Sequence, residues 1–390
     1  MIDHEDDVVE LTQALVRAAS PNPPGDERAV QDVVLAYLRR IPGVRIDVIE
    51  ARAHRPIVVG TLEGAQPGRR ILFSGHVDTV PAGDGWTRDP FGGEVSGDRL
   101  YGRGASDMKG GVAAFLVALR RLAQRRSELA GTVVVHVVPD EEPGGVLGAK
   151  VLLDRGLIVG DAAIVAEPSE LAVYTAQKGN IFASVRVAGR SAHGSMPDRG
   201  VNAITAAARL INDLESRLAP HVSAATHPLV GAATLSVGTI NGGRATNIVP
   251  DECTFTLDRR LLPGQSANAA FAELERFIDG RGSVSIDNAG ASFETPGDHW
   301  LVTTAMEAVG DVTGRTPRIG GLVGSSDARF YADGAGIPTI IVGPGAMSQA
   351  HVADEHVETK CLRLCVDVYE RLVYLALDAS EEAGRHPLGD

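Results

Sequence analysis

The sequence predicts an α/β protein with a mixed β-sheet covered by helices and a smaller ferredoxin-like α+β domain inserted into the larger one. Three observations lead to this prediction. The chain has 390 residues, which is longer than one hydrophobic core usually becomes, so two domains are expected. Helix-like and strand-like segments alternate through the first half of the chain and again near its end. Between these parts, the order of elements is β-α-β-β-α-β, which is the ferredoxin-like arrangement.

The first half of the chain begins with two segments of helical periodicity, at residues 8–18 and 27–40. A strong helix is expected over residues 110–126, since its apolar side chains share one face. Strand-like runs are found at residues 46–49, 56–62, 71–76, 132–138 and 162–166. Strands separated by helices favour a parallel or mixed sheet with both faces covered.

The middle of the chain has a different pattern. Strands are predicted over 181–187, 234–239, 253–257 and 283–288, and helices over 201–218 and 267–279. The α/β pattern then resumes with a helix over 300–309, a strand over 339–342 and a helix over 362–377. We therefore expect a larger domain formed by residues 1–177 and 293–390, with residues 178–292 inserted between its two parts.

Composition excludes several classes of protein. The net charge of −13 is spread along the chain and repels nucleic acid and anionic membranes, so neither is expected as a partner. The three cysteines do not suggest a disulfide framework, and we expect Cys361 and Cys365 to pack within a helix. Residues 1–10 are acidic where a signal peptide is basic, and no run of apolar residues is long enough to span a membrane. These features favour a cytoplasmic location.

Polar side chains follow several of the predicted strands at the point where each strand ends. In open α/β sheets, ligands bind outside the carboxyl ends of the strands. Each polar group alone is most often a solvated turn or a histidine satisfied within its loop. Together they offer the imidazole and carboxylate donors of a zinc-type site, and so many carboxylates at one sheet edge repel each other unless a cation is present. These residues are His76, Asp78, Glu141, Glu142, Glu167 and His351.

The sequence around these residues is specific. Long motifs occur in the order GHVDTVP (75–81), GWTRDPF (85–91), LYGRGASDMKGG (100–111), DEE (140–142), AEPS (166–169), GPG (343–345) and QAH (349–351), with Asp354 and Glu355 just after. Together they resemble the acetylornithine deacetylase and succinyl-diaminopimelate desuccinylase family, which is the aminoacylase and glutamate carboxypeptidase group of two-metal peptidases, or peptidase family M20. The resemblance runs from the first helix to the last.

The resemblance implies a metal-dependent hydrolase of amide bonds with a zinc-exopeptidase-like catalytic domain. His76 and Glu167 would bind one metal ion, Glu142 and His351 the other, and Asp107 would bridge the two. The family therefore implies two divalent ions per subunit. Zn²⁺ is the expected metal, with Co²⁺ or Mn²⁺ as alternatives. Two such ions can share a water, lower its pKa and polarise the scissile carbonyl.

Two more carboxylates have implied roles. Glu141 matches the family's general base, which takes the proton of the water and passes it to the leaving nitrogen. Asp78 matches the carboxylate that orients His76, and it lies two residues along an extended segment, so that both side chains face the same way. The family also implies a cis peptide bond between Asp107 and Met108.

The inserted domain would serve as a lid and as a dimerisation domain, and the active unit would be a homodimer. The segment 189–197 matches the family segment whose histidine, here His193, reaches the active site of the partner subunit. Asn247 and Arg260 match residues that contact the substrate, and an arginine suits a substrate carboxylate because it binds both oxygens. Its neighbour Arg259 is expected to be solvated.

The motifs point to more than one substrate. Glu167 and the segment 343–355 resemble acetylornithine deacetylases, which predicts hydrolysis of a small N-acyl amino acid. The segment 324–327 instead resembles desuccinylases and carboxypeptidases. A succinyl-diaminopimelate desuccinylase or a glutamate-carboxypeptidase-type peptidase is therefore the alternative, with Lys178 and Arg329 as candidate cations for a succinyl group.

Two other classes of function fit the sequence less well. An inactive scaffold of the same fold would be expected to lose the base or a metal ligand, and all of them are present. A serine hydrolase needs a Gly-x-Ser-x-Gly elbow, and neither Ser195 nor the pair Ser325 and Ser326 lies in one.

Overall fold

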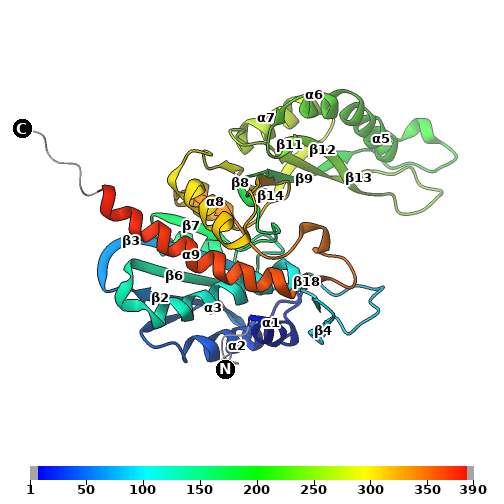
Figure 1. Cartoon of the computed structure of the whole chain (residues 1–390). Helices are drawn as coiled ribbons and strands as arrows, with labels where there is room; N and C mark the ends of the chain where they lie inside the picture. Colours follow the sequence, from blue (N-terminus) through cyan, green and yellow to red (C-terminus); the bar gives the residue numbers. More distant parts are fainter. Residues whose placement is uncertain (1–7, 384–390) are drawn as a thin grey trace, which may run out of the picture. The chain divides into compact units, whose positions relative to one another are not determined.

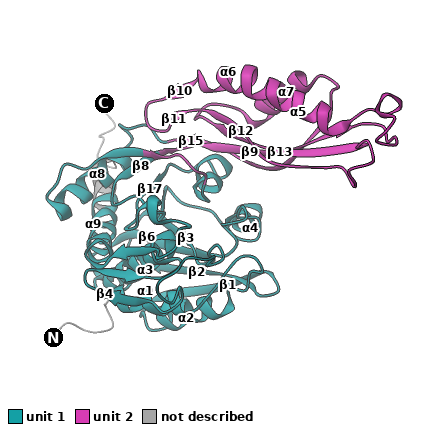
Figure 2. Ribbon diagram, turned by 90° about the vertical axis from the view of Figure 1, so that its right-hand side faces the viewer, with its two compact units in different colours: residues 1–175, 295–320, 326–390 teal, residues 176–294, 321–325 magenta. Residues whose placement is uncertain are grey.

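The computed structural model describes residues 8–383, without the side chains of residues 378–383, and it divides the chain into two compact units (Figures 1 and 2). The larger unit, teal in Figure 2, is formed by residues 1–175, 295–320 and 326–390. The inserted unit, magenta in the same figure, is formed by residues 176–294 and 321–325. Residues 1–7, which belong to the acidic segment weighed against a signal peptide, lie outside the described range.

The larger unit is built on a mixed sheet. Its strand order is β1-β2-β6-β3-β7-β17-β8-β15, with β16 pairing to β8. The central strands β6, β3, β7 and β17 run parallel to one another, whereas β1, β2, β8 and β15 pair antiparallel. The strands are β1 (Val44–Arg52), β2 (Arg55–Glu63), β3 (Gln66–His76), β6 (Ala130–Val138), β7 (Ala162–Val165), β8 (Val173–Gln177), β15 (Phe293–Glu294), β16 (Ile319–Leu322) and β17 (Thr339–Ile341).

Strand β3 shows why both faces of this sheet are covered. Phe73 packs against Phe115 on α3 and Tyr369 on α9. Its neighbour Ser74 points to the opposite face, where it accepts a hydrogen bond from the Tyr331 hydroxyl at 2.8 Å. The helices of this unit are α1 (Val8–Arg17), α2 (Arg28–Leu38), α3 (Gly110–Gln124), α4 (Ala149–Asp154), α8 (Trp300–Thr313) and α9 (Thr359–Ala383), and Tyr331 belongs to the single turn η6 (Phe330–Gly334).

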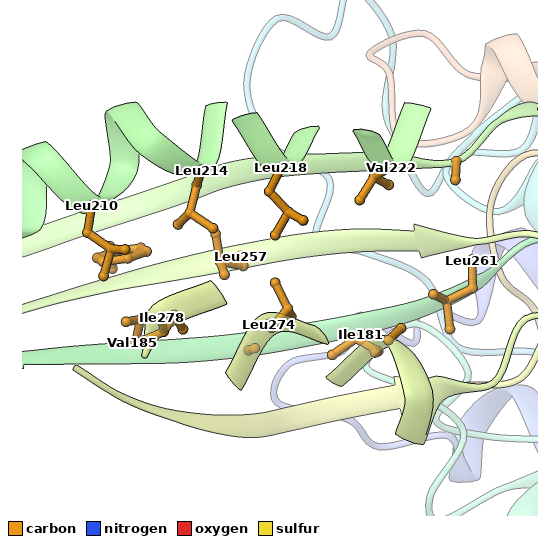
Figure 3. Packing of buried hydrophobic residues seen from close by; sticks show 14 of the residues in the cluster. Ile181, Val185, Leu210, Leu214, Leu218, Val222, Leu257, Leu261, Leu274 and Ile278 are labelled. Atoms are coloured by element: carbon orange, nitrogen blue, oxygen red, sulfur yellow. The ribbon is translucent and has the colours of Figure 1, made fainter. Parts of the chain in front are cut away.

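The inserted unit is a four-stranded antiparallel sheet with helices on one face. Its strand order is β12-β13-β9-β14, and along the chain its main elements run β9-α5-β12-β13-α7-β14. Alternate residues of β13 are buried because they face the helices, as Figure 3 shows for Leu257 beside Leu214. The elements are β9 (Gly179–Ala188), β12 (Thr234–Gly242), β13 (Glu252–Leu261), β14 (Ser283–Gly290), α5 (Ala203–Asp213), α6 (Ala219–Ser223) and α7 (Ala267–Ile278).

The predicted fold class is confirmed, both for the mixed, helix-covered sheet and for the ferredoxin-like insertion. Differences concern short strands. The small sheet of β4 (Glu94–Ser96), β5 (Arg99–Tyr101) and β18 (His356–Glu358) was not predicted, because runs of three residues are too short for a periodic signal, and the five-residue strand β8 was not predicted either. Within the described part of the chain, none of the helices combines the length and the apolar character needed to cross a membrane.

Candidate active site

The candidate site lies where the central parallel strands of the larger unit end. His76 is the last residue of β3 and pairs with Val138, the last residue of β6. The register continues beyond the strands, because the amide of Val77 donates to the Val138 carbonyl and that of Ala166 donates to the Ser74 carbonyl. The residues that follow β6 and β7 are therefore brought to the same edge as His76.

Two groups of potential metal ligands meet at this edge. In the first, His76, Glu141 and Glu167 each offer an atom within 4.8 Å of the other two. The His76 Nε2 atom lies 3.9 Å from a carboxylate oxygen of each glutamate. In the second group, Asp107, Glu142 and His351 meet the same criterion, with 3.0 Å between His351 Nε2 and Glu142 Oε2. All six residues of the two groups belong to the larger unit.

Asp107 joins the two groups. Its Oδ1 atom lies 3.2 Å from His76 Nε2, and its Oδ2 atom lies 3.6 Å from His351 Nε2. One carboxylate thus offers one oxygen to each group, which is the geometry that a ligand shared by two ions requires. The peptide bond between Asp107 and Met108 is cis, so the expectation from the sequence is confirmed.

Burial and neighbouring charges shift the pKa values of several side chains in the site. Burial raises the pKa of Glu141 well above its usual range, and the nearby carboxylates of Asp327 and Glu142 raise it further. Burial likewise raises the pKa of Glu167, with Asp107 adding to the effect. Burial alone would lower the pKa of His76, but hydrogen bonds with Asp107 and Asp78 outweigh it and raise that pKa. The positive groups of the protein do not compensate the negative charge of these carboxylates. A divalent cation would do so and would favour their ionised forms.

The donor set fits divalent metal ions of the zinc type. Histidine nitrogens and carboxylate oxygens are the ligands found at catalytic zinc sites. The first group is almost completely shielded from solvent, whereas the His351 side chain in the second is 55% exposed. Among the side chains of the two groups, His351 is therefore the one that solvent reaches most readily.

Asp78 has a wider role than the orientation of His76. The Nδ1 atom of His76 lies 3.0 Å from the Asp78 carbonyl oxygen and 3.5 Å from Asp78 Oδ1. The Asp78 carboxylate also accepts hydrogen bonds from the amides of Glu141 and Glu142, at 3.1 and 3.3 Å. One buried aspartate therefore fixes the histidine of the first group and the turn that carries both glutamates.

Asp78 is supported in turn by a buried polar network that the sequence did not reveal. The Asn22 side-chain amide donates to Asp78 Oδ2 at 3.0 Å and to Asp140 Oδ1 at 3.2 Å. Arg55 donates to Asp140 and to Glu27, at 2.9 and 2.8 Å. Burial raises the pKa of Glu27 to about 8. The only sequence signal nearby was the run of prolines after Asn22, which indicates a turn.

Glu355 is a second residue whose role was missed. It is fully buried, and its carboxylate accepts four hydrogen bonds. The amides of Ser106 and Asp107 donate to Oε1 at 2.9 and 3.1 Å. The amide of Gly104 and the guanidinium of Arg103 donate to Oε2 at 3.0 and 2.7 Å. Glu355 therefore holds the backbone that places Asp107 between the two groups. Its position just after His351 was visible in the sequence, but its function was not.

His193 and Asn247 lie together within the inserted unit. The Gly194 amide donates to the Asn247 carbonyl at 2.8 Å, and His193 forms a bridge with Ile248. The exposed ring of His193 accepts a hydrogen bond at Nδ1 from the Ser195 amide at 3.2 Å. Because Nδ1 is an acceptor, the neutral ring carries its proton on Nε2, where it can be donated.

The two arginines at the end of β13 differ in environment. Arg260 forms two hydrogen bonds with the Asp258 carboxylate, at 2.8 and 3.0 Å, and lies over the Phe182 ring. The expectation that Arg259 is solvated is wrong. It is 6% exposed because it points toward α7, where it pairs with Glu273 at 2.5 Å.

Residues 72–375 match the model of peptidase family M20/M25/M40. The chain is 34% identical to the acetylornithine deacetylase of Salmonella arizonae over 325 residues, which cover 78% of this chain and 79% of the relative. It is 33% identical to that of Klebsiella pneumoniae over 327 residues, with the same coverage. The chain belongs to the M20 family. The family that the sequence motifs indicated is therefore confirmed, and this M20 protein is a hydrolytic metalloenzyme acting on amide bonds.

Solved structures agree with the M20 fold. A metallo-carboxypeptidase from Sulfolobus solfataricus aligns over 96% of this chain and 99% of its own, with a TM-score of 0.81 at 19% identity. The aminopeptidase PepT of Bacillus cereus covers the same shares with a TM-score of 0.77 at 22% identity. A Bacillus subtilis protein described as a dinuclear metal-binding peptidase aligns with a TM-score of 0.69 at 17% identity, over 96% of this chain and 98% of its own. At these identities the likeness establishes the fold.

Proposed function

We propose that this M20 enzyme uses two divalent metal ions to hydrolyse the acyl amide of an N-acyl amino acid. The observation that carries this proposal is the Asp107 carboxylate, which offers one oxygen to each of two donor groups. In this proposal His76 and Glu167 hold one ion, Glu142 and His351 hold the other, and Asp107 bridges them. Zinc suits these donors best, and cobalt or manganese could replace it.

In the proposed mechanism, a pair of ions held by these residues would supply Lewis acidity and lower the pKa of water, so that water can lose a proton and attack near neutral pH. Glu141 is the general base. Its carboxylate lies 3.9 Å from the His76 ring nitrogen and within the first donor group, so it is close enough to take a proton from a water held there. The oxygen of water adds to the carbonyl carbon as Glu141 takes its proton. Glu141 then gives that proton to the amide nitrogen, and the C–N bond breaks to leave a carboxylic acid and an amine; at neutral pH the proton of the acid passes to the amine.

The inserted unit would complete the reaction in a homodimer, with residues 178–292 acting as a lid and dimerisation domain. Among the described strands, β12 pairs with β13 alone, so its outer edge has unpaired backbone groups. Exposed apolar side chains of the same unit include Met196, Val201, Ile204, Ile240 and Ile248. Two copies related by a two-fold axis could bury this edge and these side chains. His193 would then serve the site of the partner subunit, while Asn247 and Arg260 contact the substrate.

Among candidate substrates, the structure favours a small acyl group such as acetyl. The two cations considered for a succinyl group are already engaged. The buried Lys178 ammonium donates to the Ala232 carbonyl at 2.6 Å. Arg329 donates to the carbonyls of Ser326 and Gly144, at 2.9 and 2.8 Å. The free cysteines agree with a reducing compartment, so we also propose a cytoplasmic location.

Chelation is expected to abolish activity, and zinc or cobalt is expected to restore it. The assay should use metal-loaded protein on a panel of N-acetyl, N-formyl and N-succinyl amino acids and a few dipeptides. We expect the N-acetyl compounds to be cleaved at the acyl amide. Exclusive release of C-terminal residues from the peptides would favour the carboxypeptidase alternative, and activity that resists chelation would rule out the metal mechanism.

The variant Glu355→Gln is expected to lower metal affinity by about 10–100-fold, as is typical when a residue that orients a ligand is changed. The amide nitrogen of glutamine cannot accept a hydrogen bond, so donors around Asp107 lose their acceptor. Affinity can be measured by competition with a chromogenic chelator. Glu63→Gln is the matched control, since Glu63 is exposed at the end of β2. Equal affinity in both variants would show that Glu355 does not position the ligand.

A further inference from the structure

A cavity of about 720 Å³ lies in the larger unit and contains none of the proposed metal ligands. Its walls are formed by residues 170–172, by the end of α8 with residues 315–318, by residues 344–349, and by β18 with the start of α9. Glu141 does not line it. The volume is in the range of pockets that bind small organic molecules. Nothing in the proposed reaction uses this cavity.

Three walls of the cavity continue directly into the metal centre. Residue Glu170 is three positions beyond Glu167, Gln349 is two positions before His351, and His356 follows Glu355. The wall at 344–349 also contacts the segment of the bridging ligand, because the Ser106 hydroxyl and the main chain of Ala346 exchange two hydrogen bonds, at 3.0 and 3.1 Å. A molecule in the cavity would therefore touch the segments that carry ligands of both ions.

The wall nearest Glu167 has an unusual backbone. Glu170 and Leu171 are consecutive residues with positive φ angles, +54° and +61°. Residues other than glycine rarely adopt this conformation, which is uncommon above all for a leucine. It is held by the amides of both residues, which donate to the carbonyls of Gly345 and Gly343 at 2.8 and 3.0 Å. Such strained segments are concentrated at ligand clamps and switch regions.

The charges around the cavity favour a monoanion. Arg315, Arg318 and Lys360 line it, and none of them has a salt-bridge partner among the described residues. The 25-residue helix α9 also begins here, at Thr359, and the amino end of a helix attracts negative charge. Two carboxylates, Glu170 and Glu358, oppose these cations and would repel a dianion more strongly than a monoanion.

Apolar side chains from three of these walls also line the cavity, namely Leu171, Val309, Val312 and Leu364. We propose that the cavity binds a small organic carboxylate with an apolar body, and that its occupancy is transmitted to the metal centre. The proposed binding of a carboxylate in the cavity does not depend on the proposed reaction. The proposed effect of this binding on the metal centre rests on the proposed ligands His351, Glu167 and Asp107.

Cys361 provides a reporter of binding, because it lines the cavity and is partly exposed, whereas Cys253 and Cys365 are buried. Burial raises the pKa of its thiol to about 12, so alkylation by iodoacetamide at alkaline pH should be slow enough to follow by mass spectrometry. The probes are hexanoate, 4-phenylbutyrate and inorganic phosphate, each titrated against the zinc-loaded full chain. At ten times its dissociation constant, a carboxylate probe should slow alkylation about tenfold, since only the unoccupied fraction reacts.

The protection should be saturable, and it should be lost in Arg315→Ala with Arg318→Ala but kept in Arg39→Ala, which removes an exposed arginine of the same unit. Saturating 4-phenylbutyrate should also change the rate at which a chelator removes zinc by at least about twofold.

No protection of Cys361 by either carboxylate, or protection by phosphate alone, would overturn the proposed ligand. Protection with an unchanged rate of zinc removal would overturn the transmission. Failure of either leaves the chelation and substrate panel unaffected, so the two proposals are tested separately.

Discussion

Replacing Glu141 by glutamine is expected to leave both metal ions bound while lowering kcat by about 10²–10⁴-fold, the usual contribution of a general base. Glutamine keeps the size of the side chain but cannot take a proton from water. The test is sharp because Glu141 lies close enough to His76 and Glu167 to be a ligand itself. Metal content and kcat measured on the same preparation distinguish the two roles.

Glu142→Gln is the matched comparison. Its Oε2 atom lies 3.0 Å from His351 Nε2, so its loss should remove one ion of the pair as well as activity. Val80 also donates to Glu142, which helps to fix the carboxylate. If both variants lose the same amount of metal, the assignment of one glutamate as base and the other as ligand is wrong.

The sequence was sufficient to place the candidate ligands at one edge of the sheet because the information is local. The strands that precede His76, Glu142 and Glu167 are short apolar runs that end abruptly in polar residues. Parallel neighbours bring such ends together regardless of the details of packing. The fold class followed from the same periodicity, together with the change of pattern in the middle of the chain.

The supporting residues could not be predicted in the same way because their partners are distant in sequence. Glu355 bonds to the Ser106 amide across 249 positions, and Asn22 bonds to Asp140 across 118. Arg259 was misplaced for a related reason. Alternation within β13 turns it toward α7, where Glu273 compensates its charge, and a charged pair at a strand end does not reveal which face each member takes.

His193→Ala is expected to lower kcat by about 10²–10³-fold, the usual cost of losing one donor to a developing oxyanion. The proposed donor is Nε2, because Nδ1 accepts the hydrogen bond of the Ser195 amide. His193→Gln keeps a side-chain N–H and should therefore retain part of the activity, whereas Ser195→Ala should have a smaller effect than His193→Ala. Metal content should stay at the wild-type level in all three variants.

A mixed dimer tests whether His193 acts on the partner subunit. Homodimers of His193→Ala and of Glu141→Gln should each be nearly inactive, since each lacks one required group at every site. In the mixed dimer, one site combines an intact Glu141 with an intact His193 from the other subunit, and the second site lacks both. Differently tagged subunits allow the mixed dimer to be purified and its composition to be verified. One active site out of two predicts about half of the wild-type activity per dimer. A verified mixed dimer that stays inactive would show that His193 does not act in trans, because action within one subunit leaves every site incomplete.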